Sequence, residues 1–445
     1  MATTDILVAK RATTAVRGDE SRTAAWGFTV LVVALYMINW GDKAVLGLVA
    51  QDLKEEIGIS EEQIGLIASA FFVMFIVGNL GAGVINRSMA LRWSLSALAI
   101  GWSLTMVPIV MSATFTVLLL GRMFLGLLEG PSSPLVHTAV YSWHPREKRG
   151  LPSAVITMSA SIAKVLIAPA LAVVAASYGW RAAFLSLAAV GLLWLVMWLP
   201  MWKLGPYGGE AAKSATHIEA DKEPNVPWAK VLTSGTFLGA WLASMPMYAI
   251  VAAVLTFLPS YFEKGLGFTR VQAGSMFGFP SIASIITLVG MTLISDRLIS
   301  RGASSRMLRG IVPTIGLLIC SATLISLPYI DAKYVAVAWV SIGYALRVTV
   351  SPLFNASLSE IVPPKQLAGM FGIFLALQSL GGVYGPFLAG KIVKGAGSAV
   401  SGYPLAFQIF GAMSLVGAVI ALICINPERD KARLRPRQRL FAEGV

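Results

Sequence analysis

Long apolar runs separated by short polar segments dominate the pattern of this 445-residue chain. Twelve runs hold about 20 residues or more, the length that a helix needs to cross a hydrocarbon layer of about 30 Å. The short alternating segments typical of transmembrane strands are not seen in the sequence. We therefore predict an all-α polytopic membrane protein with twelve transmembrane helices. The predicted spans are 27–49, 62–85, 92–112, 115–141, 151–177, 181–202, 232–262, 271–294, 308–329, 333–357, 367–393 and 404–426.

A single long polar interruption, which begins at Lys203, divides the spans into two groups of six. The composition supports this organisation, because 56% of the residues are hydrophobic and only 13% are charged, whereas soluble domains carry about 25% charged residues. The predicted domains are an N-terminal tail (1–25), a first six-helix bundle (26–202), an inter-bundle loop (203–230), a second six-helix bundle (231–427) and a basic C-terminal tail (428–445).

The net charge of +13 follows from where the basic residues lie along the chain. We count basic residues at the very ends of spans with the adjoining loops. If the termini and the even-numbered loops share one side, that side then carries 24 of the 35 Lys and Arg residues, the opposite loops carry 7, and 4 remain inside spans. The positive-inside rule then places both termini in the cytoplasm. We expect a multi-pass plasma membrane protein, of the bacterial inner-membrane type, that binds no nucleic acid.

Four short motifs recur in the same order in both halves. GISEEQIG at Gly58 matches GFTRVQAG at Gly267, and NRSMALR matches DRLISRG. Ser-Pro-Leu at Ser133 returns at Ser351, and PREKRG matches PPKQLAG. Parallel repeats of six spans predict two bundles related by a pseudo-two-fold axis along the membrane normal, with the substrate between them. The repeat also makes Arg347 the equivalent of Glu129, so we expect these two to face each other.

Charged residues inside the spans are the candidate functional residues, because a charge at bilayer depth costs at least about 2.5–3.5 kcal/mol. The inventory holds four cations and two acids. A surplus of buried positive charge favours a bound anion, and it suits a ligand with two acidic groups. The members are Asp42, Lys43, Arg122, Glu129, Lys164 and Arg347.

The chain resembles the major facilitator superfamily, and more narrowly its anion:cation symporter family. The resemblance is carried by NWGDK at Asn39, RMFLGLLEG, LPSYFEKGLGFTRVQAG and LISDRLISRG. It implies rocker-switch transport in which Asp42 and Glu129 couple protons and Lys43 takes the place of a substrate-binding arginine. It also implies a cytoplasmic gate, formed by Asp296, Arg297 and Arg87.

Each buried charge has a second interpretation. Arg347 either binds substrate or forms a structural contact with Glu129. Lys164 either binds ligand or takes part in coupling, or its amine is kept neutral by burial. Lys43 contacts ligand or snorkels to the interface, while Arg122 orients Glu129 or touches substrate. Neighbouring helical residues diverge by about 100°, so Asp42 and Lys43 cannot point at one spot. Uncharged substrate-binding candidates, which could equally be packing residues, are Trp40, Tyr248 and Gln378.

These features predict a secondary transporter that imports a small organic anion with protons. The anion would be a carboxylate, and a dicarboxylate or a sugar acid would fit. An anion exchanger or a proton-coupled efflux carrier of the same fold is the alternative. The sequence shows no nucleotide-binding loop, hydrolytic triad or metal cluster, so we expect no enzyme activity, no metal and no cofactor besides the proton. We expect a monomer in the lipid bilayer.

Overall fold

The computed structural model describes residues 2–145, 149–207, 225–363 and 366–435. Within these residues, twelve helical segments are long and apolar enough to cross a membrane, which confirms the predicted spans. The first half comprises α1 (Ala2–Leu48), α2 (Ala50–Ile57), α3 (Glu61–Ser88), α4 (Leu91–Met111), α5 (Phe115–Glu129), α6 (Ser132–Tyr141), α7 (Gly150–Tyr178) and α8 (Trp180–Met201).

The second half is more often interrupted by short 3₁₀ and π-helical turns, which are named η. It comprises α10 (Trp228–Leu232), α11 (Gly235–Ser260), η2 (Tyr261–Gly265), α12 (Arg270–Met276), α13 (Phe279–Ser300), η3 (Arg306–Ile311), α14 (Val312–Ser326), η4 (Leu327–Tyr329), α15 (Lys333–Leu346), η5 (Arg347–Thr349), α16 (Val350–Ile361), α17 (Leu367–Gly395), α18 (Ala399–Cys424) and α19 (Pro427–Leu434).

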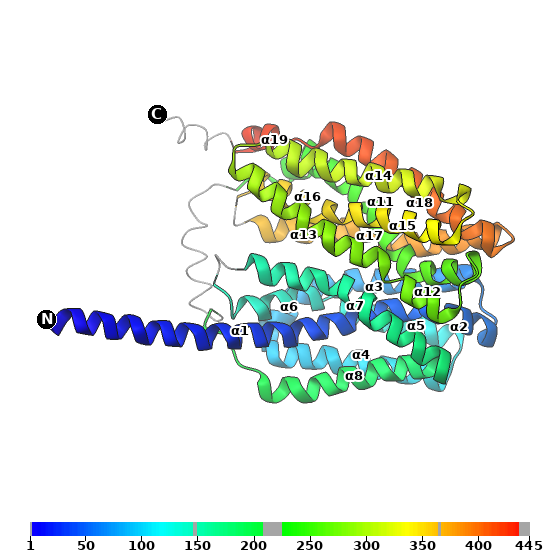
Figure 1. Cartoon of the computed structure of the whole chain (residues 1–445), viewed down its shortest axis with the longest axis horizontal. Coiled ribbons are helices and arrows are strands. Elements are labelled where there is room, and N and C mark those ends of the chain that lie inside the picture. The colour runs from blue at the N-terminus through cyan, green and yellow to red at the C-terminus, as the bar shows by residue number, and fades with distance from the viewer. Residues whose placement is uncertain (1, 146–148, 208–224, 364–365, 436–445) are drawn as a thin grey trace.

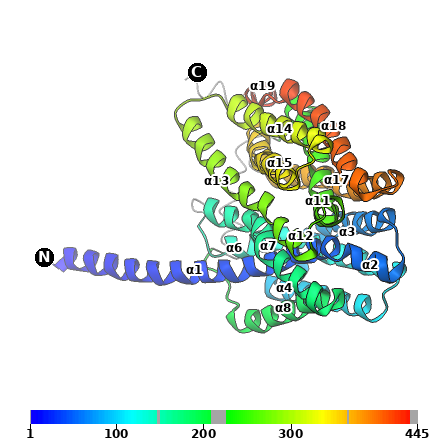
Figure 2. The same ribbon diagram turned by 45° about the vertical axis from the view of Figure 1, so that its right-hand side comes forward.

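The two halves form two layers that lie side by side (Figure 1). They meet where α3 packs on α17, α7 on α12 and α13, and α1 on α11. The beginning of α1 and helix α19 lie at one end of the molecule, and α2 and α12 lie at the other (Figures 1 and 2). We call the latter the α2 end. The N-terminal tail differs from the sequence prediction, because its backbone continues the helix of the first span from Ala2 and projects beyond the bundle.

The internal repeat is visible in matching helix starts. Ser60 caps α3 in a reciprocal capping box with Gln63, and Thr269 caps α12 in the same way with Gln272. A hydroxyl that accepts from the third backbone N–H, with a glutamine that reaches back, satisfies two otherwise unpaired donors. Glycine precedes each box in the left-handed region, at φ 75° for Gly58 and 72° for Gly267, where other residues are strained.

The fourth and tenth spans are both broken near their middle, and each break carries a charged residue. Helix α5 ends at Glu129 and gives way to α6, while α15 gives way at Arg347 to η5 and then α16. Pro131 and Pro352 follow the two breaks, and a proline has no N–H to continue the helical hydrogen bonds. The equivalence of Glu129 and Arg347 is thus confirmed at the level of the helices that position them.

Candidate functional site

Lys43 and Glu129 form a buried ion pair within the first half. Lys43, on α1, is 6% exposed and Glu129, at the end of α5, is fully buried. The Lys43 ammonium donates to a Glu129 carboxylate oxygen and, at 2.5 Å, to the side-chain oxygen of Asn39. Asn39 lies one helical turn before Lys43, which places both on one face of α1. The pair is internally neutral, so Lys43 neither snorkels to the interface nor remains free for a ligand here.

Aromatic rings surround this ion pair, and some of its polar atoms lack a hydrogen-bond partner. The Lys43 nitrogen lies 5.2 Å from the ring centre of Trp40, 5.5 Å from that of Phe71 and 5.4 Å from that of Phe75, within the range of cation–π attraction. The second carboxylate oxygen of Glu129 and the side-chain nitrogen of Asn39 are buried without a partner among the described residues. Such atoms are costly unless a proton, water or ligand meets them.

Arg122 ties α5 to α1 and does not contact Glu129 through a hydrogen bond or ion pair in the described residues. Its guanidinium donates to the backbone oxygen of Asp42 at 2.7 Å and lies 4.9 Å from the ring centre of Phe71. No direct contact in the described residues therefore supports the predicted role of Arg122 in orienting Glu129. The side chain is 2% exposed.

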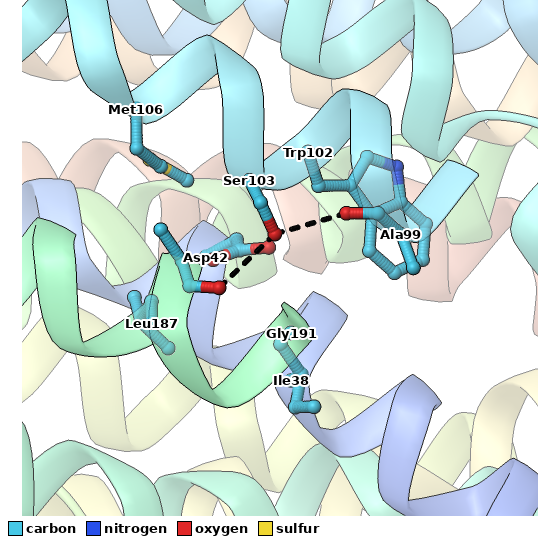
Figure 3. Close-up of a pocket in the computed structure, with 9 residues that line it drawn as sticks. Ile38, Asp42, Ala99, Trp102, Ser103, Met106, Leu187 and Gly191 are labelled. Atoms are coloured by element: carbon cyan, nitrogen blue, oxygen red, sulfur yellow. Dashed lines mark hydrogen bonds between the residues drawn. The ribbon is translucent and has the colours of Figure 1, made fainter. Parts of the chain in front are cut away.

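Asp42 points away from the Lys43 pair, as the angular separation of adjacent helical residues requires. It lines a small pocket inside the first half, together with residues of α4 and α8 such as Ser103 and Gly191 (Figure 3). The Asp42 side chain is 2% exposed and has no ion-pair partner among the described residues. Ser103 is already engaged, because its hydroxyl donates to the backbone oxygens of Ala99 and Ala188.

Lys164 and Arg347 meet on one tyrosine at the boundary between the halves. The Lys164 ammonium on α7 donates to the Tyr344 hydroxyl at 3.0 Å, and the Arg347 guanidinium lies 3.7 Å from the centre of the Tyr344 ring. Arg347 also contacts the Met247 sulfur at 3.1 Å. Lys164 is 5% and Arg347 6% exposed. Neither forms an ion pair with a described acid, and the Arg347 Nε has no partner there.

The expected contact between Glu129 and Arg347 is not formed. Glu129 is bound to Lys43, and Arg347 turns to Tyr344 and Met247. The sequence analysis assigned no functional role to Tyr344 or to Asn39. Both carried a signal, because Tyr344 lies three residues before Arg347 and Asn39 four before Lys43, and helical residues with these spacings share a face.

The uncharged candidates and the predicted gate stay predictions. Trp40 contacts Lys43 as described, Tyr248 packs edge-on against Phe72 with ring centres 6.0 Å apart, and Gln378 is buried on α17. Arg297 is exposed near the end of α13. The side chains of Arg87 and Asp296 lie outside the described part of the structure.

At the α2 end the halves are joined by polar contacts that the sequence did not predict. Arg270 pairs with Asp52 at 2.6 Å, and Lys394 with Glu62 at 2.7 Å. The Tyr403 hydroxyl of the second half donates at 2.7 Å to Glu61 of the first. The ion pairs that join described residues of the two halves all lie at this end.

Glycines bring the backbones of the halves into contact in the same region. A Cβ on Gly65 would overlap the carbonyl oxygen of Pro386, and one on Gly390 would overlap that of Glu61. A Cβ on Gly47 would overlap the carbonyl oxygen of Leu255. Only glycine allows so close an approach. The α2 end is therefore closed by main-chain packing as well as by ion pairs.

The comparison with known proteins agrees with this architecture. The model of the Major Facilitator Superfamily matches residues 32–351 and 314–443. A solved structure with the same fold is that of a bacterial homologue of the human lysosomal transporter Spinster, in an inward-facing and unoccupied conformation. It has a TM-score of 0.74 and 17% identity, and the alignment covers 92% of this chain and 98% of that one.

Three curated bacterial relatives align over most of both chains. A probable galactarate/D-glucarate transporter of Bacillus subtilis is 24% identical over 90% of this chain and 92% of its own. A hexuronate transporter of the same organism is 25% identical and a probable sulfoacetate transporter of Cupriavidus necator 26%, each over 88% of this chain and 92% of its own. The fold, the repeat and these matches lead to one conclusion: the chain belongs to the Major Facilitator Superfamily and is a multi-pass membrane transporter, not an enzyme.

Proposed function

We propose that the chain imports a small organic anion together with one or more protons, by rocking its two halves about the bound substrate. This proposal depends mainly on Lys164 and Arg347. They are two buried cations from opposite halves, and neither has an acidic partner among the described residues. Burying unpaired charge is costly, and an anion bound there would offset that cost in both conformations. The sugar-acid and sulfonate transporters among the relatives carry substrates of this charge type.

The proton role falls to Glu129 and Asp42. Glu129 exchanges its Lys43 contact for a proton when the halves move, and Asp42 takes a proton in its own pocket. A co-transported proton offsets negative substrate charge, which makes uptake favourable against an inside-negative potential. With both termini in the cytoplasm, closure of the α2 end corresponds to the inward-facing state of a monomeric plasma-membrane carrier.

The test uses purified protein in two steps. A thermal-shift screen against carboxylates and sulfonates identifies ligands, since a ligand of the native state raises its stability. Uptake of the best ligand into proteoliposomes is then measured with the outside acidic or at equal pH. We expect the acidic outside to increase accumulation, and Glu129→Gln to keep counterflow exchange while it loses that increase. Uptake that does not depend on the proton gradient would favour anion exchange. If Glu129→Gln lost both counterflow exchange and proton-driven accumulation, Glu129 would not have a specific role in proton coupling.

A further inference from the structure

The surplus positive charge of the membrane interior is concentrated at one place. In the first half, Lys43 is neutralised by Glu129. Arg122 donates to the backbone oxygen of Asp42, which is the second buried acid of this half. These four residues carry two positive and two negative formal charges. The remaining two cations, Lys164 and Arg347, therefore hold the whole surplus, and both contact the neutral side chain of Tyr344.

Tyr344 keeps these two cations close together in spite of their repulsion. Its hydroxyl accepts from the Lys164 ammonium, and its ring faces the Arg347 guanidinium, which attracts a cation through the ring quadrupole. Having accepted from Lys164, the hydroxyl keeps its own O–H to donate, and no described residue receives it. Arg347 likewise keeps an unpaired buried N–H. The three side chains thus offer an ammonium, a guanidinium and a hydroxyl donor to one ligand.

We propose that this triad of Lys164, Tyr344 and Arg347 selects substrates with two acidic groups, and that Tyr344 is the positioning residue that sets the two cations for a dianion. This inference rests on the proposed anion transport and specifies its substrate class. A dianion neutralises both cations, whereas a monoanion leaves one buried charge uncompensated, which is costly. Because Lys164 belongs to the first half and Arg347 to the second, the dianion also links the halves.

The experiment compares matched ligands that differ by one charge. The probes are D-glucarate and D-gluconate, succinate and succinamate, and sulfoacetate and its amide, with affinity measured by titration of the purified full chain at pH 7. In at least one pair we expect the dianion to bind tenfold or more tightly than the monoanion, a difference of about 1.4 kcal/mol. Equal affinities within every pair would overturn the proposal.

Four variants test which residue causes the preference for the dianion. In Lys164→Gln the ratio of the two affinities should fall below about threefold, whereas Lys164→Arg should keep it, and Lys333→Gln, at an exposed lysine on α15, should leave it unchanged. Tyr344→Phe keeps the ring beside Arg347 and should lower the ratio severalfold, mainly by weakening dianion binding.

The outcomes separate this inference from the proposed function. A preference that survives in Lys164→Gln would overturn the inference, while transport of an anion by the wild type would leave the carrier function intact. If no ligand of any pair is bound or transported, the proposed function itself fails. A melting temperature for each empty variant near that of the wild type shows that the protein is folded.

Discussion

Two pairs of buried charges, about equally hidden from solvent, are satisfied in opposite ways. Lys43 has its counter-charge, Glu129, within the same half of the molecule. Lys164 and Arg347 come from different halves and share an uncharged tyrosine. The charge of the Lys43–Glu129 pair is balanced without a ligand and can change when the pair gains a proton, whereas the two uncompensated cations need an anion. The difference assigns proton handling to the first site and substrate charge to the second.

The largest expected effect comes from breaking the neutral pair. Lys43→Met leaves the Glu129 carboxylate buried without its partner, which should lower the stability of the empty protein by about 3–5 kcal/mol. The double variant Lys43→Met/Glu129→Leu removes both charges and should recover most of this loss. Melting curves in detergent at pH 7 measure both. A double variant as unstable as the single one would show that the cost is lost packing.

The role of backbone packing in closing the α2 end can be tested with two glycine substitutions on α3. Gly65→Ala places a Cβ against Pro386, whereas the Cβ of Gly81→Ala, also on α3, meets nothing within 4 Å. Overpacking of this kind costs about 1–3 kcal/mol, here only in the closed state. Spin labels at residues 55 and 271 should therefore report a longer distance in Gly65→Ala and an unchanged one in Gly81→Ala. Equal distances in both would mean that the backbone contact does not determine closure.

The uncompensated pair should respond in the opposite direction from the neutral one. Lys164→Met removes a buried unpaired charge, at the expense of one hydrogen bond to Tyr344 worth about 0.5–1.5 kcal/mol. We expect the empty protein to be unchanged or more stable by about 1 kcal/mol, and its thermal response to anions to be reduced. A loss of stability as large as that of Lys43→Met would contradict the assignment of surplus charge to this site.

The smallest effect is expected at an ion pair between Glu56, on α2 outside the membrane spans, and Arg181, at the beginning of α8. Arg181 and Trp180 donate to Glu56 and lower the pKa of this carboxyl to about 2. A lowered folded-state pKa gives stability that is present above the ordinary value near 4.5 and is lost as the pH falls toward 2. Since the pair is 42% exposed, Glu56→Gln should cost less than about 1 kcal/mol.

The pH dependence of this variant gives the check. The melting difference between wild type and Glu56→Gln should stay constant from pH 8 to pH 5 and shrink only below about pH 4.5. A difference that disappears between pH 7 and pH 5 would contradict the lowered pKa.

Much of the fold was readable from the sequence because its determinants are local. Apolar length predicted the spans, and the motifs at Gly58 and Gly267 predicted a repeat that the matching capping boxes confirm. The repeat also predicted equivalent positions for Glu129 and Arg347. It could not predict their partners, because symmetry relates backbones while side-chain contacts depend on which residues the opposing helices supply.

The contacts between the halves were the least predictable feature. The pairing of Asp52 with Arg270 and the packing of Gly65 on Pro386 join segments more than two hundred residues apart, and they depend on the conformation of the carrier. A sequence shows which residues are charged or small, but the relative placement of two rigid bundles decides which of them meet.

The division of labour between the two sites is tested most directly by proton uptake upon ligand binding. The best ligand is added to the purified protein in weak buffer with a pH indicator, and the wild type is compared with Glu129→Gln and Arg347→Gln. We predict that the wild type binds ligand and takes up protons, that Glu129→Gln binds ligand with clearly less proton uptake, and that Arg347→Gln does not bind. Retained binding in Arg347→Gln together with lost binding in Glu129→Gln would contradict the assignment of the two sites.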